Sequence, residues 1–456
     1  MITPSPILQT YAAPAIPHTP EASGAVTIVR RLREKGFTAY LAGGCVRDIL
    51  LGRQPKDFDI ATDAVPDRVL ALFPGSVEVG KAFGVIRVPV ADLWYEVATF
   101  RQDAAYRDGR HPDAVTFSDP ANDALRRDFT INALFLDPEG GRILDYVEGM
   151  ADIQRRVIRA VGNPLARFHE DHLRLLRAVR FAASLSFTLD PATAQAIRST
   201  AASAANVSAE RVREELTRIW LEAQQAGDSL VLLSDLGLLD VLLPEVAAMR
   251  GVNQPPEYHP EGDVFQHTVI MLNRMRTDDP RLAWSVLLHD VGKPPTARQK
   301  EGRWCFERHA NVGSETAQRI LERLRFSNDD TGAIAFIVGN HMRYAEVTRM
   351  RRSTLRQLAG EPTFPAELEL HRLDCEASHG DLVNYRFLVE FRKALDSEPV
   401  LPPPWITGRD ILSLGIPEGP EVGAWRKKAY EAQLEGTFPD RSALLEWLRR
   451  EIPHSP

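Results

Sequence analysis

Strand-like segments occur only in the first third of this 456-residue chain, and this segregation restricts the folds that it can adopt. Four short apolar runs have the composition and alternation that are typical of strands, and a turn separates the last two. They are residues 37–41, 58–61, 84–90 and 94–100. From residue 152 onward, apolar residues recur instead at helical spacing. The sequence therefore predicts an α+β fold in which one mixed domain precedes helical domains.

Changes in composition divide the chain into five predicted parts. Its start is rich in proline and nearly free of charge, which is typical neither of a membrane-spanning helix nor of a signal peptide, so we expect a flexible leader. A proline-rich linker at 399–404 belongs to the tail region. The predicted parts are a leader at 1–24, a mixed domain at 25–150, helical regions at 151–238 and 239–395, and a helical tail at 396–456.

Charge and cysteine content exclude several classes of protein. The chain has 62 acidic and 55 basic side chains, so its net charge is −7, which is not typical of a protein that coats nucleic acid non-specifically. Any nucleic-acid binding must therefore use a local basic patch. The three cysteines fit neither a disulfide framework nor a structural zinc site, which favours the reducing cytoplasm. No uncharged run is long enough to predict a membrane span.

A glycine pair followed by two aspartates is the strongest local signal. Gly43 and Gly44 would let the backbone approach a phosphate, and the helix predicted to follow them would direct free N–H groups toward it. Arg47 adds a guanidinium fork. Asp57 and Asp59 lie two apart on a predicted strand, so both point to one side, where their repulsion favours a cation such as Mg²⁺. Alone, an Asp-x-Asp pattern is more typical of a turn or a helix cap.

Three further side chains extend this predicted phosphate site. Glu96, on the strand predicted at 94–100, is either a third carboxylate that faces the two aspartates or a solvated edge residue. Arg126 and Arg127 are suited to neutralise a triphosphate and to stabilise charge during phosphoryl transfer. Adjacent arginines are also common on protein surfaces, which is the alternative explanation for this pair.

An arginine-rich segment at 170–180 is predicted to form one helix. Asp171, Arg174, Arg177 and Arg180 recur at steps of three, so neighbours share a face beside an apolar stripe. An aspartate and an arginine together accept and donate hydrogen bonds, as the pairing edge of a base does. Surface salt bridges are the alternative explanation for this spacing.

These segments, in this order, resemble the class II tRNA nucleotidyltransferases, the family of CCA-adding enzymes and bacterial poly(A) polymerases. The four segments are residues 43–48, 57–59, 126–133 and 170–177, and the resemblance extends over about residues 25–450. It implies a polymerase-beta-like nucleotidyltransferase head with an antiparallel or mixed sheet, followed by a helical neck, body and tail. It also implies template-independent addition of CCA, or of its terminal A, to tRNA 3′ ends from CTP and ATP.

The resemblance also implies a role for each predicted site residue. Asp57 and Asp59 would hold two Mg²⁺ ions, one for activation of the terminal ribose hydroxyl and one for the triphosphate. Asp171 and Arg174 would select CTP and ATP in place of a template. The remaining nucleotide-binding residues would be Gly43, Gly44, Arg47, Arg127, Arg177 and Arg180.

Three other segments are similar to segments of this family. Residues 101–112 resemble its flexible loop, whose presence argues against an enzyme that adds only CC. Residues 210–215 resemble the neck segment that braces the nucleotide pocket. In the tail, Arg426, Lys427 and Lys428 are candidates for contacts with tRNA phosphates, and a solvated helix face is an equal alternative.

Histidines and aspartates of the region 239–395 form a second candidate site. Imidazole and carboxylate ligands suit Mn²⁺, Ni²⁺ or another transition metal, whose bound water can attack a phosphoester. The order of these residues resembles the HD metal-dependent phosphohydrolase superfamily, and the alternative is an HD-like body without catalysis. The predicted ligands are His267, His289, Asp290, His309, His341 and Asp374.

Three functions therefore remain open from the sequence. The first is CCA addition, with addition of the terminal A alone as its variant. The second is poly(A) synthesis, which the acidic balance and the histidines disfavour. The third is a metal-dependent HD phosphohydrolase whose head only binds nucleotide, which the complete set of head residues disfavours.

Overall fold

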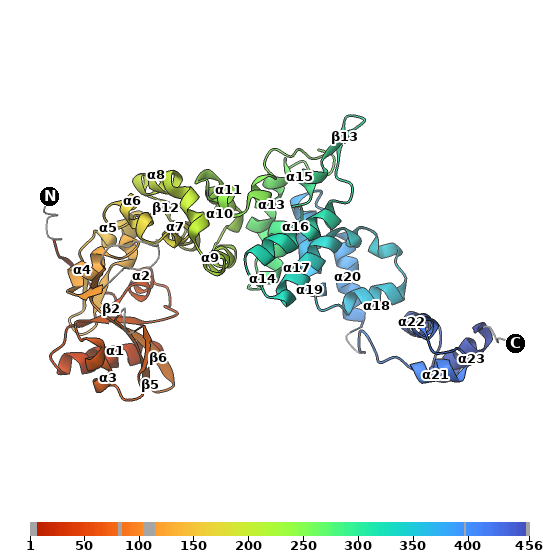
Figure 1. Cartoon of the computed structure of the whole chain (residues 1–456), viewed down its shortest axis with the longest axis horizontal. Helices are drawn as coiled ribbons and strands as arrows, with labels where there is room; N and C mark the ends of the chain where they lie inside the picture. Colours follow the sequence, from red (N-terminus) through yellow and green to blue (C-terminus); the bar gives the residue numbers. More distant parts are fainter. Residues whose placement is uncertain (1–6, 81–83, 104–114, 396–397, 453–456) are drawn as a thin grey trace. The chain divides into compact units, whose positions relative to one another are not determined.

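The chain folds into two compact units, Met1–Pro244 and Glu245–Pro456, in a computed structural model (Figure 1). The structure describes residues 7–80, 84–103, 115–395 and 398–452. Among these residues, helices are either too short or too polar to cross a bilayer. Strands are concentrated in the first unit and helices dominate the second, as the sequence predicts.

The first unit begins with an eight-stranded mixed sheet, in the order β1-β10-β9-β2-β3-β6-β5-β4. The pairing of β3 with β6 is parallel, and the other pairings are antiparallel. The α+β prediction with a mixed sheet is therefore confirmed. The strands are β1 (Gln9–Ala12), β2 (Ala39–Ala42), β3 (Asp59–Thr62), β4 (Val77–Gly80), β5 (Val85–Val90), β6 (Leu93–Thr99), β9 (Phe135–Asp137) and β10 (Arg142–Asp145).

Alternating burial explains why these segments form strands. In β3 and β6, Ile60 and Val97 lie opposite each other and are fully buried, whereas Asp59 and Glu96 are exposed. One face of the sheet packs against helix α1, which contributes a fully buried apolar stripe. The helices near the sheet are α1 (Pro20–Glu34), α2 (Gly44–Leu50), α3 (Pro66–Leu72), α4 (Pro120–Leu125) and α5 (Gly149–Arg155).

The prediction of a flexible leader at 1–24 is wrong for its described part. Residues 9–12 form β1, which pairs antiparallel with β10, and α1 begins at Pro20. Thr19 caps this helix, because its hydroxyl accepts a hydrogen bond from the Ala22 amide at 3.2 Å. Proline is tolerated at the first helical position, since that position has no intrahelical donor to lose. The proline-rich composition therefore conceals a strand and a helix start.

The prediction of one helix at 170–180 is also wrong. Helix α6 (Pro164–Glu170) ends before Asp171, whose backbone is extended, and α7 (Leu173–Leu185) then begins. The Asp171 carboxylate accepts a hydrogen bond from the Leu173 amide at 3.0 Å, a local turn that competes with helix formation. Asp171 consequently stands at a break between helices and not on a continuous helical face.

Among its described residues, the rest of the first unit contains helices and two small pairs of strands. Strands β11 (Val157–Ile158) and β12 (Thr188–Leu189) pair in parallel, so the neck at 151–238 is not all-helical as predicted. Strands β7 (Arg101–Asp103) and β8 (Val115–Phe117) flank most of the predicted flexible loop, whose residues 104–112 lie outside the described residues. The remaining helices are α8 (Pro191–Thr200), α9 (Ala209–Glu222), α10 (Ala226–Asp235) and α11 (Leu238–Leu242).

The described part of the second unit is helical apart from one hairpin, which the prediction for 239–395 did not include. Strands β13 (Arg298–Lys300) and β14 (Arg303–Cys305) flank Glu301 and Gly302, both at positive φ, as in a tight hairpin turn. The tail helices α21 (Gly408–Ser413), α22 (Pro420–Glu435) and α23 (Arg441–Glu451) share a small apolar core. The other helices are α12 (Pro244–Ala247), α13 (Val264–Arg274), α14 (Pro280–Leu288), α15 (Lys293–Thr296), α16 (His309–Arg323), α17 (Asn328–Asn340), α18 (Arg352–Ala359), α19 (Phe364–Ala377) and α20 (Val383–Ala394).

Candidate active site and metal centre

At Gly43, the first glycine of the pair, the backbone passes between the side chains of Arg127 and Asp59. Gly43 has a φ of 76° and precedes α2. A Cβ at this position would lie 3.0 Å from Nη1 of Arg127 and 3.8 Å from Oδ2 of Asp59. A side chain here would therefore be strained and would fill the space between these two groups.

Three carboxylates meet near strands β3 and β6: Asp59 on β3, Asp57 two residues before it, and Glu96 on β6. Asp57 and Asp59 are exposed, whereas Phe58 between them is buried, as the period of a strand requires. The β3–β6 register aligns Glu96 with Asp59. Desolvation of the Asp59 carboxylate by the protein around it and the negative charges of Glu96 and Asp57 raise its pKa, Arg127 lowers it, and together they bring it to about 6. Bound cations would relieve this repulsion.

A buried carboxylate holds the two adjacent arginines. Asp123, which is 1% exposed, accepts hydrogen bonds from Arg126 at 2.6 Å and 2.9 Å and from Arg127 at 2.9 Å and 3.1 Å. Arg127 also donates to the Asn132 carbonyl, while Arg47 donates to the Asn132 side chain at 2.7 Å. The arginine pair is therefore fixed toward the glycine turn and is not a freely solvated surface pair.

The arginines of α7 are anchored by acidic residues that lie outside this helix. Arg177 donates two hydrogen bonds to Asp128, at 2.6 Å and 2.8 Å. Burial alone would raise the pKa of Asp128, but the charge and hydrogen bonds of Arg177 lower it to about 2. Arg174 donates to Glu170 at 2.6 Å and to the Arg126 carbonyl at 3.2 Å. These contacts, with the burial of Arg174, exclude a purely surface role for the segment.

Three of these guanidinium groups lie against the ring of Phe181, a residue not predicted as part of the site. The guanidinium carbons of Arg47, Arg177 and Arg180 lie 5.2 Å, 5.2 Å and 4.2 Å from the Phe181 ring centroid. Such cation–π contacts orient the cations without neutralising them. The signal in the sequence was a lone phenylalanine after the arginine repeat, which is indistinguishable from an ordinary core residue.

These groups surround a cavity of about 510 Å³ with a strongly positive lining. Eight arginines and three aspartates line it, so it suits a ligand with several negative charges. A second cavity of about 480 Å³ shares Asp59 and Arg47 with it and also includes Asp57. The predicted head residues on the first cavity are Gly43, Gly44, Arg47, Asp59, Arg127, Asp171, Arg174, Arg177 and Arg180.

Glu215 provides a test of how this arginine array is held. The Arg180–Glu215 ion pair, 2.6 Å long, is buried on both sides. We expect Glu215→Ala to lower the free energy of unfolding by about 3–5 kcal/mol, because Arg180 would keep its buried charge and lose its short ion pair, with only the Glu222 carboxylate left at 3.8 Å. Urea denaturation measures this change. The neighbouring exposed Glu214→Ala should change it by less than about 0.5 kcal/mol, and equal effects of the two variants would contradict the assignment.

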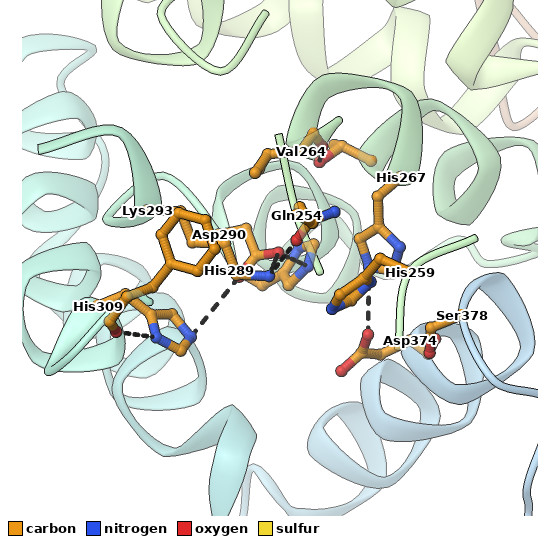
Figure 2. Close-up of polar contacts among 12 residues, drawn as sticks. Gln254, His259, Val264, His267, His289, Asp290, Lys293, His309, Asp374 and Ser378 are labelled. Atoms are coloured by element: carbon orange, nitrogen blue, oxygen red, sulfur yellow. Dashed lines mark hydrogen bonds and ion pairs between the residues drawn. The ribbon is translucent and has the colours of Figure 1, made fainter. Parts of the chain in front are cut away.

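In the second unit, helices α13, α14, α16, α17 and α19 and the residues at their ends bring all six predicted histidine and aspartate ligands together. Figure 2 shows His267, His289, Asp290, His309 and Asp374. His267 lies on α13 and Asp374 on α19, and His267 Nε2 is 3.1 Å from Asp374 Oδ1. Asp290 follows α14, with Oδ1 3.7 Å from His309 Nε2 and 3.8 Å from His341 Nε2. The donor atoms form two groups, each within 4.8 Å: His267, His289 and Asp374, and Asp290, His309 and His341.

Close packing of the backbone makes this convergence possible. A Cβ on Gly292 would lie 2.1 Å from the His309 carbonyl oxygen and 2.5 Å from the Gly313 amide nitrogen. Only glycine permits this approach, because no flexible side chain is available to give way. The start of α16 is thereby held against the residues that follow α14, and His309 reaches Asp290.

The hydrogen bonds of the rings direct their other nitrogens inward. His289, His309 and His341 each donate from Nδ1 to a backbone carbonyl, at 2.8 Å, 2.9 Å and 2.7 Å. In the neutral form of each ring, Nε2 then carries the lone pair, which is the tautomer that binds a cation. Nε2 of His309 and of His341 lie only 3.2 Å apart. Two lone pairs at this distance repel each other unless a proton or a cation lies between them.

The charges at this cluster match those of a cation site. Burial lowers the pKa of His341 to about 4, so this ring is neutral near pH 7 and available as a ligand. Burial opposes the charge of His267, but Asp374 and Glu261 outweigh it and raise its pKa to about 9. The Asp290 carboxylate also contacts Lys293 at 2.7 Å. The sequence analysis did not single out Lys293 or Glu261.

Three family models match successive parts of this chain. The Poly A polymerase head domain matches residues 39–159, and a probable RNA and SrmB-binding site of polymerase A matches residues 186–250. The HD domain matches residues 262–376. The first match covers strands β2 to β10 with Gly43, Asp59 and Arg127, the second covers part of the neck, and the third covers all six predicted ligands of the histidine cluster. Helix α7, with its cavity arginines, lies between the first two matches.

Relatives with similar sequences extend over nearly the whole chain. A CCA-adding enzyme of Lactobacillus delbrueckii subsp. bulgaricus is 46% identical over 431 residues, which are 93% of this chain and 96% of the relative. An A-adding tRNA nucleotidyltransferase of Deinococcus radiodurans is 34% identical over 452 residues, covering 91% and 97%.

Solved structures give the same result for the fold. The Bacillus stearothermophilus CCA-adding enzyme in complex with CTP has a TM-score of 0.72 and 28% identity, covering 95% of this chain and 98% of that one. The Thermotoga maritima CCA-adding enzyme complexed with tRNA, at 19% identity and a TM-score of 0.61, shares the fold. The predicted resemblance is confirmed: this chain is a nucleotidyltransferase of the tRNA nucleotidyltransferase family, to which CCA-adding and A-adding enzymes belong.

Proposed function

We propose that this enzyme adds CCA, or only the terminal A, to the 3′ end of tRNA from CTP and ATP without a nucleic-acid template. One observation carries the proposal: an arginine-lined cavity of about 510 Å³ has Asp59, of the carboxylate group, at its wall. A nucleoside triphosphate has the charge for this lining. The names of the relatives, which include enzymes with CTP and tRNA bound, support the same substrates.

In the proposed reaction, the terminal ribose oxygen of tRNA attacks the α-phosphorus of the incoming nucleotide. A new phosphodiester bond forms, the bond between the α-phosphorus and its bridging oxygen breaks, and pyrophosphate leaves. Asp57 and Asp59 fit Mg²⁺, and Glu96 adds a third oxygen donor beside them. When bound, Mg²⁺ would activate the hydroxyl and balance charge on the leaving group. Arg47 and Arg127 would hold the triphosphate against the glycine turn.

Asp171 and Arg174 are the proposed readers of the base. Both line the cavity, and Arg211 holds the Asp171 carboxylate at 2.9 Å. We expect Arg174→Ala to lower kcat/KM for CTP and ATP by about 10- to 150-fold, the range for loss of a bidentate base contact. GTP and UTP should then be incorporated relatively better. Steady-state rates with each nucleotide measure this, with the exposed Arg198→Ala as the control. Unchanged selectivity in Arg174→Ala would contradict the role.

The activity itself is tested with tRNA that ends before CCA, after C, or after CC. Labelled CTP and ATP are supplied with Mg²⁺, separately and together. Two additions from CTP followed by one from ATP support CCA addition, and a single A added only after CC supports the terminal-A variant. A long ladder of A would support a poly(A) polymerase instead, and no incorporation would contradict the proposal.

A second proposed activity belongs to the histidine cluster. The convergence of six donor residues favours a bound transition metal such as Mn²⁺ or Ni²⁺, with which the site would hydrolyse a phosphoester. Phosphate release from a phosphomonoester, and ring opening of a 2′,3′-cyclic phosphate, are the assays. If neither occurs with Mn²⁺ or Ni²⁺, the body is HD-like in shape alone. The proposed substrates, tRNA and nucleoside triphosphates, and the low cysteine content of the chain favour the predicted cytoplasmic location.

A further inference from the structure

The carboxylate of Glu261, in the turn before α13, links His259 of the same turn to His267 of the histidine cluster. Oε1 of Glu261 lies 2.6 Å from Nδ1 of His267 and 2.9 Å from Nδ1 of His259. The Glu261 side chain is only 7% exposed, and the His259 and His267 rings meet edge to face with centroids 5.0 Å apart. An ionised carboxylate only accepts hydrogen bonds, so both Nδ1 atoms donate.

The carboxylate lies behind the His267 ring with respect to the other donor atoms. Nε2 of His267 faces Asp374 Oδ1 at 3.1 Å, whereas Nδ1, on another edge of the ring, faces Glu261 (Figure 2 shows the His267 and Asp374 contact). The contact with Glu261 occupies Nδ1 of His267, so only Nε2 of this ring is left to face a cation held by the other donor atoms. Glu261 is thus placed to orient a ligand and not to serve as one.

This arrangement distinguishes His267 from the other described rings of the cluster. His289, His309 and His341 each use a backbone carbonyl as the acceptor for Nδ1. A carboxylate accepts a stronger hydrogen bond, fixes the tautomer and makes the opposite nitrogen a stronger donor to a metal.

We propose that Glu261 is a positioning residue that holds His267 with Nε2 toward the cation, and that His259 braces Glu261 through the same carboxylate oxygen, Oε1. The proposal rests on the cation site proposed above for the histidine cluster. It assigns neither His259 nor Glu261 as a ligand. The expected consequence of losing the carboxylate is weaker metal binding at an unchanged number of sites.

The test is calorimetric titration of Ni²⁺ into the full-length protein, in an Asp59→Ala background that removes binding at the head. We expect Glu261→Gln to weaken the Kd by about 10-fold and Glu261→Ala by up to about 100-fold, with stoichiometry unchanged. Glutamine keeps an acceptor for His267 but loses the charge, which explains the order. The matched control is Glu257→Gln, an exposed carboxylate on the same segment whose contact is Arg303 at 3.7 Å. It should leave the Kd unchanged.

A spectroscopic measurement separates positioning from a general structural effect. With Co²⁺ in the same proteins, the visible ligand-field bands should shift in Glu261→Gln and stay in place in Glu257→Gln. Because glutamine has nearly the shape of glutamate, this variant serves even if Glu261→Ala does not fold.

The outcomes are distinguishable. Absence of Ni²⁺ binding by the background protein would overturn the cation site itself. Binding by the background protein with the same Kd and spectrum in Glu261→Gln and Glu261→Ala would overturn the positioning role alone. Loss of one equivalent of Ni²⁺ in Glu261→Gln would overturn it differently, because Glu261 would then be a ligand.

Discussion

The variant Asp59→Ala should incorporate CTP and ATP into tRNA at least about 10³-fold more slowly than the wild type. Asp59 lies on the wall of the arginine cavity and next to Glu96 across the parallel strand pair, so its loss removes a proposed cation ligand at the reacting phosphate. A metal ion contributes several kcal/mol to stabilising charge in such a transition state, which corresponds to this factor. Single-turnover incorporation at saturating nucleotide measures it.

Two controls make the Asp59→Ala result interpretable. Asp92→Ala, an exposed aspartate in the turn between β5 and β6, should retain the wild-type rate. Ni²⁺-dependent phosphate release by Asp59→Ala should also be retained if both proposed activities exist, since the histidine cluster belongs to the second unit. Incorporation by Asp59→Ala within tenfold of the wild type would contradict the proposed role of the carboxylates.

The reverse separation is expected for His289→Ala combined with Asp290→Ala. Phosphoester hydrolysis should fall by about 10³-fold or more, because the pair supplies one donor to each group of ligands. Nucleotide incorporation should remain within a few-fold of the wild type. Phosphate release and label incorporation are measured on the same preparation.

The charge of Asp290 also stabilises the fold, so the double variant needs a control that preserves the shape of this side chain. Asp290 contacts Lys293 at 2.7 Å, so alanine would leave a buried ammonium without this partner. Asp290→Asn keeps the shape and an acceptor while removing the charge, and should also lose hydrolysis. Loss of both activities in well-folded protein would contradict two separate sites.

The local parts of both sites were predictable from the sequence. The alternation across residues 57–59 placed both aspartates on one side of a strand, and Gly43 and Gly44 marked the turn beside them. These features depend on near neighbours in the chain, where periodicity and glycine geometry act directly. The histidine cluster was predicted by resemblance, and the structure brings all six predicted residues together.

The features that were mispredicted or missed depend on contacts that residue spacing in the sequence does not reveal. Asp123, Asp128 and Glu215 hold the arginines, yet the spacing of these acids does not show which arginine each one pairs with; Asp128 and Glu215 stood out only through the resemblance of residues 126–133 and 210–215. The break at Asp171 arises because its side chain competes with the helix for a backbone amide. Strand β1 escaped notice because its partner, β10, lies more than a hundred residues away.

Crystals grown with Mn²⁺ and a non-hydrolysable ATP analogue would test the central claim most directly. Anomalous diffraction at the manganese edge should show a peak between the carboxylates of Asp57 and Asp59. The triphosphate should lie against Arg47 and Arg127 with the base near Arg174. A triphosphate bound elsewhere, or no manganese peak at the two aspartates in crystals that contain the analogue, would contradict the account.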